Sequence, residues 1–284
     1  MTIDNVLGPE AVGSGKPTMV AAPGGASLRW RGEGRSAGRV LERPFEVEHN
    51  GQTVPGLLWT PEGALSSPLV LLGHGGGGSK REGYIERTAR NLAGRRGLAA
   101  AAVDGPVHGD RRADPRAPSR LVVMEFAQIW ANDGEAMTDS MVADWHAVLD
   151  VLATLPEIRG DLCGWWGLSM GTIVGLPFVA AEPRVKAAVF GLMGLTGPTR
   201  VRIERDAPKV VCPILFLAQS DDVVFPRDQA LALFDALGST DKRFQLHVGG
   251  HGDLPLEAFE ASARFLARHL SDPGAADGGA PKPP

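Results

Sequence analysis

The sequence is poor in the residues that mark several common classes of protein. It has two cysteines, Cys163 and Cys212, too few for a disulfide scaffold or a cysteine-rich zinc module. Its 29 lysines and arginines are outnumbered by 33 aspartates and glutamates, so it lacks the basic footprint of a nucleic-acid-binding protein. No apolar stretch reaches the roughly 18 residues of a membrane span, and the acidic start MTIDNVLGPE is unlike a secretory signal. We therefore expect a cytoplasmic protein with no nucleic-acid or membrane partner.

The composition is that of a globular domain with unstructured ends. The 284 residues are 43% hydrophobic and 22% charged, and a folded chain of this length buries roughly three quarters of its extended surface. Residues 1–36 are rich in glycine, alanine, serine and proline without sustained periodicity, and residues 271–284 have few apolar side chains. Such segments cannot offset the entropy of ordering. We expect a flexible segment at 1–36, one folded domain at 37–270 and a disordered tail at 271–284.

Short apolar runs alternate with helical patterns along this domain. Asn50-Gly51 is a hairpin signal between the first two runs. Strands are expected at 39–49, 53–60, 68–74, 98–105, 162–169, 185–192, 213–220 and 243–248, and helices at 83–97, 136–155, 171–181, 226–238 and 254–270. This alternation predicts an α/β fold with a mostly parallel sheet of about eight strands and helices on both faces.

One segment interrupts the alternation. Residues 110–132 begin with charge and proline and continue into the apolar stretch LVVMEFAQIW. Insertions of this kind in an open sheet lie at the carboxyl ends of strands, where ligands bind. We expect 110–132 to form a short lid or a wall of a binding pocket.

The sharpest motif is Gly167-Leu168-Ser169-Met170-Gly171, which fits G-x-S-x-G between an expected strand and an expected helix. A nucleophilic serine in this context sits on a strained turn that projects its hydroxyl from the sheet, and side chains at the two glycines would clash there. The N-terminal N–H groups of the following helix then point at the site. The motif favours Ser169 as a nucleophile.

A glycine-rich turn, His74-Gly75-Gly76-Gly77-Gly78-Ser79, follows the strand at 68–74. Such a turn brings backbone N–H groups close to a developing oxyanion. A phosphate-binding loop of the form G-x-x-x-x-G-K-[ST] is the rival reading, but the residue after Gly78 is serine and the lysine comes one position late. The pattern therefore favours an oxyanion hole over nucleotide binding.

An acid and a base follow downstream. Asp221 and Asp222 end one strand, and His251 follows the last strand; His247 is a competing histidine inside that strand. The order Ser169, Asp, His251 along the chain is that of α/β-hydrolases and not of other serine hydrolases. The histidines at 74 and 108 do not fit a metal-binding spacing, so no metal or cofactor is expected.

These motifs together resemble a known family. LLGHGGGG, VDGPVHGD, GLSMG, QSDDVVFP and GGHGDLP make residues 39–270 similar to α/β-hydrolases of the serine esterase type, in the dienelactone-hydrolase-like branch. Dienelactone hydrolases themselves use a cysteine nucleophile where this chain has Ser169. The resemblance implies Asp222 as the acid, because the family's acid stands four residues before a proline, here Pro226.

The resemblance also implies a mechanism. Ser169 would attack an ester carbonyl while His251 takes its proton and Asp222 orients the imidazole. Backbone N–H groups of Met170 and Gly76, with Gly75 second, would bind the oxyanion. The expected activity is hydrolysis of a small-molecule carboxylic ester through an acyl-enzyme. A thioesterase or acyltransferase, an amide or peptide hydrolase, and a non-catalytic binding protein remain alternatives, and the oligomeric state is left open.

Overall fold

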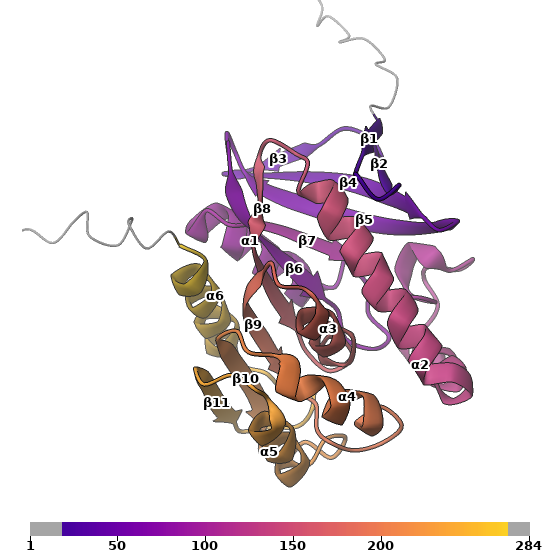
Figure 1. The fold of residues 1–284 in the computed structure, drawn as a ribbon, viewed down its shortest axis with the longest axis vertical. Helices are drawn as coiled ribbons and strands as arrows, with labels where there is room; N and C mark the ends of the chain where they lie inside the picture. Colours follow the sequence, from indigo (N-terminus) through magenta and orange to yellow (C-terminus); the bar gives the residue numbers. More distant parts are fainter. Residues whose placement is uncertain (1–18, 272–284) are drawn as a thin grey trace, which may run out of the picture.

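A computed structural model gives the fold of the chain and describes residues 19–271. Eleven strands form a single twisted sheet in the order β1-β2-β4-β5-β7-β6-β8-β9-β10-β11, with β3 paired to β4 (Figure 1). The strands are β1 (Met19–Ala21), β2 (Ser27–Trp30), β3 (Arg35–Ala37), β4 (Val40–His49), β5 (Gln52–Pro61), β6 (Ser67–Gly73), β7 (Ala99–Val103), β8 (Ile158–Gly167), β9 (Val185–Gly191), β10 (Ile214–Gln219) and β11 (Lys242–His247).

The expected α/β architecture is confirmed. Strands β4 to β11 are the eight that the apolar runs predict. β4, β5 and β7 pair antiparallel, whereas the pairs from β7 through β6, β8, β9 and β10 to β11 are all parallel. The carboxyl ends of the parallel strands therefore meet along one edge of the sheet, where ligands bind in open α/β folds.

Three further strands lie where a flexible segment was expected. The prediction of flexibility for residues 1–36 is wrong for 19–36, because β1 pairs with β2 and β2 pairs with β4. Ala26, Leu28 and Trp30 alternate along this segment, the first two are buried, and Trp30 packs edge-on against Phe45 on β4. This burial offsets the ordering entropy of a glycine-rich stretch. Residues 1–18 and the predicted tail beyond Ser271 lie outside the described residues.

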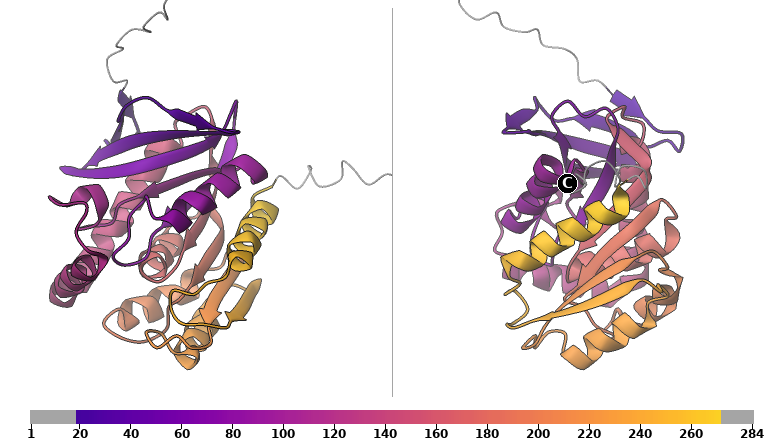
Figure 2. Two further views of the ribbon diagram at one scale, coloured as in Figure 1. Left: turned by 180° about the vertical axis from the view of Figure 1, so that it is seen from behind. Right: turned by 90° about the vertical axis from the view of Figure 1, so that its left-hand side faces the viewer.

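Helices cover both faces of the sheet (Figure 2). α1 and α6 pack together on one face, and α2, α3, α4 and α5 bury their apolar residues on the other. No helix within 19–271 combines the length and the apolar character needed to cross a bilayer. The helices are α1 (Gly83–Arg96), α2 (Ser119–Leu152), α3 (Met170–Ala181), α4 (Arg200–Asp206), α5 (Arg227–Ala236) and α6 (Leu256–Leu270), with 3₁₀ helices η1 (Gly109–Arg111) and η2 (Ala207–Lys209).

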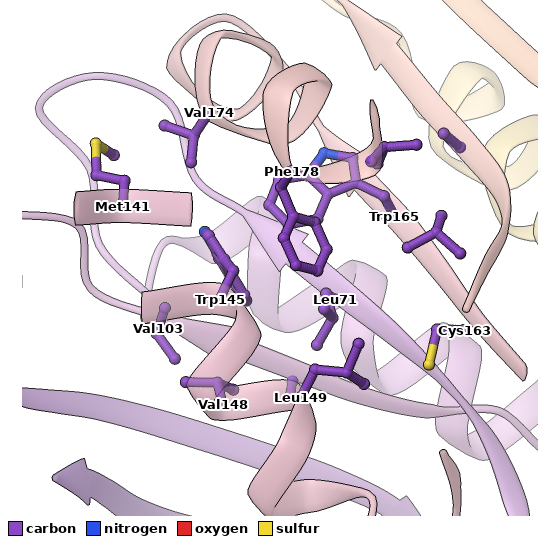
Figure 3. Close-up of a cluster of buried hydrophobic side chains, with 14 of the residues drawn as sticks. Leu71, Val103, Met141, Trp145, Val148, Leu149, Cys163, Trp165, Val174 and Phe178 are labelled. Atoms are coloured by element: carbon purple, nitrogen blue, oxygen red, sulfur yellow. The ribbon is translucent and has the colours of Figure 1, made fainter. Parts of the chain in front are cut away.

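A cluster of aromatic side chains fixes α3 against the sheet (Figure 3). Trp165 on β8 is fully buried, with its ring centroid 4.8 Å from that of Trp145 on α2 and 5.4 Å from that of Phe178 on α3. A Cβ atom on Gly175 would lie 2.0 Å from Trp165 Nε1. The absence of a side chain at 175 therefore lets α3 approach the strand that leads into the G-x-S-x-G turn.

The segment 110–132 is mostly helical. After η1 and a turn, α2 begins at Ser119 and runs to a kink at Asp133, where φ is −156° and ψ is 74°. Val122, Phe126 and Trp130 recur every four residues and are buried, while the intervening side chains face outward. This spacing is that of an amphipathic helix, and it extends the helix expected at 136–155 toward its N-terminus.

Candidate active site

Ser169 lies on a tight turn between β8 and α3, at the carboxyl edge of the sheet. Its φ of 56° and ψ of −119° are strained for any residue with a side chain. A Cβ atom on Gly167 would lie 2.6 Å from the carbonyl oxygen of Gly171, and one on Gly171 would lie 2.4 Å from that of Gly73. Both glycines of the motif are therefore required by close backbone contacts.

Thr172, the residue after the motif, holds this turn to β9. Its buried hydroxyl lies 2.9 Å from the carbonyl oxygen of Gly167 and 2.8 Å from that of Gly191, and it accepts a hydrogen bond from the Gly191 N–H at 3.0 Å. The N–H of Ser169 donates to the Gly191 carbonyl at 2.9 Å. Fully satisfied buried polar groups rigidify their surroundings, so the threonine helps to maintain the strained serine.

The structure brings the expected serine, histidine and aspartate together. His251 Nε2 lies 3.0 Å from Ser169 Oγ, and His251 Nδ1 lies 2.8 Å from Asp222 Oδ2. Because a carboxylate only accepts hydrogen bonds, it selects the imidazole tautomer that carries its proton on Nδ1. Nε2 is then free to accept the proton of the serine hydroxyl.

The two neighbouring aspartates have different environments. Asp222 is buried, and its Oδ1 accepts hydrogen bonds from the N–H groups of Val224 at 2.9 Å and Phe225 at 3.0 Å. Asp221 is exposed and accepts a hydrogen bond from Ser220 Oγ. His247, the competing histidine, lies within β11 and forms no hydrogen bond to Ser169 or Asp222 in the described structure. The geometry therefore favours Asp222 and His251 as partners of Ser169.

Ser169 and His251 open into a cavity of about 280 Å³. Its walls come from the glycine turn, the start of α1, the start of α2, the loop before α6, and α6 itself. The residues are Gly75, Gly76, Gly77, Gly78, Glu82, Tyr84, Ser119, Leu168, Leu192, Gly252, Leu254 and Phe259. Ser119 is the first residue of α2, so the segment expected to form a lid contributes to the cavity wall.

Two backbone N–H groups beside this cavity are free to bind an oxyanion. The N–H of Gly75 donates to Tyr84 Oη at 2.7 Å, and that of Gly77 donates to His108 Nε2 at 3.1 Å. In residues 19–271, no hydrogen bond uses the N–H of Gly76 or Met170. The role expected of Met170 and Gly76 stays a prediction, and neither N–H has another partner among the described residues. The expectation for Gly75 disagrees with this geometry, because its N–H already has a partner that sequence reasoning missed.

Buried histidines hold the glycine turn to the loop after β7. His74 Nε2 accepts a hydrogen bond from the Gly105 N–H at 3.0 Å, and its Nδ1 lies 2.9 Å from the Gly75 carbonyl oxygen. Burial lowers the pKa of His74, and burial with the nearby His74 lowers the pKa of His108 to about 4. Both rings are therefore neutral at pH 7, the state in which Nε2 can accept a hydrogen bond.

A buried ion pair completes this attachment. Asp104 is fully buried and accepts hydrogen bonds from the N–H groups of Lys80 at 2.9 Å and Asp110 at 2.8 Å. The Lys80 ammonium pairs with Asp104 and lies 2.6 Å from Asp110 Oδ2. The glycine turn and the loop after β7 therefore form one rigid unit beneath the cavity.

Replacing Lys80 by methionine should destabilise the fold strongly. The substitution leaves the Asp104 carboxylate buried without its cation, a change that typically costs about 3–5 kcal/mol. Urea denaturation of both proteins would measure the difference in free energy of unfolding. The matched control is Arg81→Met, since the Arg81 side chain is 52% exposed and its contacts with Glu42 and Glu86 are 3.7 Å long; it should change stability by less than about 1 kcal/mol. A similar loss in both variants would contradict the assigned role.

The pKa of the Tyr84 phenol should be well above that of a free tyrosine. Burial raises its pKa from 10.0 to about 12, while the hydrogen bond from the Gly75 N–H opposes the rise. The folded state then keeps a proton that the unfolded state has lost, so this contribution to stability is present below pH 10 and declines between pH 10 and 12. Tyr84 is the only tyrosine in the chain, so phenolate absorbance reports on it alone. A titration midpoint near pH 10 for the folded protein would contradict the burial of the Tyr84 phenol.

The described residues offer no evident metal site. His, Cys, Asp and Glu side chains in residues 19–271 nowhere gather in a group of three that could hold a metal ion. The thiols of Cys163 and Cys212 are both free, and burial raises the pKa of each to about 12. Neither cysteine lines the cavity beside Ser169.

The chain is similar in sequence and fold to known hydrolases. The sequence model of the Dienelactone hydrolase family matches residues 54–252. A solved structure of a cold-adapted esterase from an Arctic intertidal metagenomic library is 39% identical, with a TM-score of 0.75 over 85% of this chain and 99% of that one. A dienelactone hydrolase from Anabaena variabilis shares the fold at 20% identity, with a TM-score of 0.58 over 81% of this chain and 97% of that one.

A curated relative also matches. The 2,6-dihydropseudooxynicotine hydrolase of Paenarthrobacter nicotinovorans is 31% identical over 158 residues, which is 55% of this chain. The matched segment spans 37% of the length of that hydrolase.

Proposed function

Since the chain belongs to the dienelactone hydrolase family and is by that membership a carboxylic ester hydrolase, we propose that it cleaves esters through a serine acyl-enzyme. Ser169 is the nucleophile, His251 the general base and Asp222 the acid that orients it. The single observation that carries this proposal is the continuous hydrogen-bonded chain from Asp222 through His251 to Ser169, ending in a cavity. Nucleophile, base and orienting group within hydrogen-bond reach are the signature of such catalysis.

In the acylation step, Ser169 Oγ forms a bond to the carbonyl carbon as its proton moves to His251 Nε2. The carbonyl oxygen becomes an oxyanion that accepts hydrogen bonds from the N–H groups of Gly76 and Met170, and each such donor typically contributes about 3–4 kcal/mol in the transition state. Collapse of this intermediate breaks the carbon–oxygen bond to the alcohol, which takes the proton from His251. Asp222 stabilises the imidazolium throughout.

Deacylation repeats the sequence with water. A water molecule attacks the acyl carbon as His251 takes its proton, and collapse of the second tetrahedral intermediate returns that proton to Ser169. The products are a carboxylic acid and the free enzyme. The cavity of about 280 Å³ suits a small-molecule ester. Hydrolysis of a thioester or an amide would pass through the same acyl-enzyme. A non-catalytic binding protein would be expected to lack a member of the triad, and all three residues are present here.

Covalent labelling tests this proposal directly. A fluorescent phosphonate that reacts with activated serines should label the wild-type protein and fail to label Ser169→Ala or His251→Ala. Ser220→Ala is the matched control, because Ser220 lies two residues from Asp222, is exposed and does not line the cavity; it should label like wild type. Folded wild-type protein that does not label, or a Ser169→Ala variant that does, would overturn the proposed function.

A further inference from the structure

Glu82 places a carboxylate in the wall of the cavity that contains Ser169 and His251. It directly precedes α1, and its side chain folds over the glycine turn. A Cβ atom on Gly78 would lie 2.9 Å from Glu82 Cγ and 3.5 Å from Glu82 Cδ. The carboxylate therefore lies beside the turn that supplies the Gly76 N–H.

This carboxylate has no structural partner in the described residues. Glu82 occupies the N-cap position of α1 but makes no side-chain capping hydrogen bond. No side-chain hydrogen bond or ion pair within 19–271 involves it, and the adjacent Arg81 is directed toward Glu42 and Glu86. Since neither a helix cap nor an ion pair explains Glu82, its charge remains available to a ligand in the cavity.

No positive charge balances Glu82 in the cavity. Of the described residues that line it, none is lysine or arginine. The four arginines of the 110–132 segment do not line the cavity: Arg111 pairs with Asp144, Arg112 pairs with Glu125, and Arg116 and Arg120 are exposed. An anionic substrate would therefore meet a carboxylate without a cation to compensate for it.

Aromatic rings line the cavity beside this carboxylate. Tyr84 and Phe259 both border it, with ring centroids 6.4 Å apart and planes inclined at 42°. A carboxylate together with aromatic faces is the combination that binds ammonium groups, through charge attraction and the negative faces of the rings. Neutral alkyl groups gain only the apolar contact.

We propose that Glu82 is a specificity-determining residue that binds an ammonium group of the substrate, so that esters carrying a cation are preferred over uncharged isosteres and anionic esters are disfavoured. This inference rests on the proposed esterase function. The preferred substrates are esters with a quaternary or protonated amino group close to the scissile bond.

Two matched pairs of esters test it, one for each side of the scissile bond. The alcohol-side pair is acetylcholine and neohexyl acetate, its uncharged isostere. The acyl-side pair is the p-nitrophenyl ester of γ-trimethylammoniobutyrate and the same ester with a tert-butyl group in place of trimethylammonium. The quantity measured is the ratio of kcat/KM for the cationic ester to that for its neutral isostere, which cancels effects common to both substrates.

In at least one pair, Glu82→Gln should lower this ratio by about 5- to 30-fold, the range expected for one partly solvated charge pair. Added salt should lower the ratio for wild type and have little effect on the variant. Glu86→Gln is the matched control, since Glu86 lies one turn further along α1 and faces Arg81 and Arg90; it should leave the ratio unchanged.

The outcomes separate this inference from the function on which it rests. Hydrolysis of the neutral esters by wild type, and its loss in Ser169→Ala, tests the esterase function alone. If that holds and the ratios of wild type and Glu82→Gln agree within twofold for both pairs, the role of Glu82 is overturned. If wild type hydrolyses none of the four esters in a Ser169-dependent manner, the preference for cationic esters fails together with the function.

Discussion

Replacing Ser169 by alanine is expected to lower kcat for a p-nitrophenyl ester by about 10,000- to 1,000,000-fold, the range found when a triad nucleophile is removed. The variant loses the Oγ atom that forms the covalent bond, and His251 can then only direct water at the carbonyl. The N–H groups of Gly76 and Met170 remain, so residual activity should still exceed the rate in water. Steady-state kinetics on purified protein would measure the loss, with the variant used at high concentration so that its low residual rate can be detected.

A substitution at a second serine, Ser220, shows whether the loss of activity is specific to Ser169. Ser220→Ala should keep kcat within about twofold of wild type, because surface substitutions away from a site usually have small effects. Both variants should keep the wild-type circular dichroism spectrum. A Ser169→Ala enzyme that retains a tenth of the wild-type rate would show that another group performs the attack.

Replacing Asp222 by asparagine is expected to lower kcat by about 10,000-fold. Oδ1 of Asp222 accepts two backbone N–H bonds, from Val224 and Phe225, so the asparagine amide oxygen should take that position. The NH₂ group then faces His251 Nδ1 and can only donate to it. The proton of the imidazole is forced onto Nε2, and this nitrogen can then no longer accept the proton of Ser169.

Asp221→Asn is the matched control for this effect. Asp221 is exposed and has no hydrogen bond to His251 in the described structure, so the variant should keep kcat within about threefold of wild type. If Asp221→Asn abolished activity while Asp222→Asn retained it, the acid assignment would be wrong. A pH profile of kcat/KM for the Asp222 variant adds a readout that a folding defect would not produce.

The sequence predicted those features that depend on local pattern. The eight runs correspond to β4–β11. Interior strands such as β7 and β10 are buried along their whole length, and a strand buried on both faces needs a continuous apolar run whatever surrounds it. The G-x-S-x-G motif was recognisable for a similar reason: Gly167 and Gly171 are fixed by backbone contacts within the turn itself. The order of serine, aspartate and histidine then pointed to residues that meet at one edge of the sheet.

Features that depend on long-range contacts were missed or misjudged. β2 is stabilised by pairing with β4. Its alternating apolar residues are too few to predict a strand without knowledge of that pairing. The hydrogen bond from Gly75 to Tyr84 and the approach of Glu82 to Gly78 depend on how α1 packs over the glycine turn. No periodicity in the sequence encodes that packing, so neither the partner of Gly75 nor the cavity carboxylate could be predicted.

The position of β11 at the border of the sheet has a consequence for the working temperature of the enzyme. β11 pairs only with β10 in the described sheet, and the loop that carries His251 follows it directly, whereas Ser169 follows the interior strand β8. Elements at a margin open locally at lower cost than the interior. We therefore expect turnover to fall on heating before the domain as a whole melts, and we expect reinforcement of β10, β11 and α6 to raise the temperature at which activity is lost.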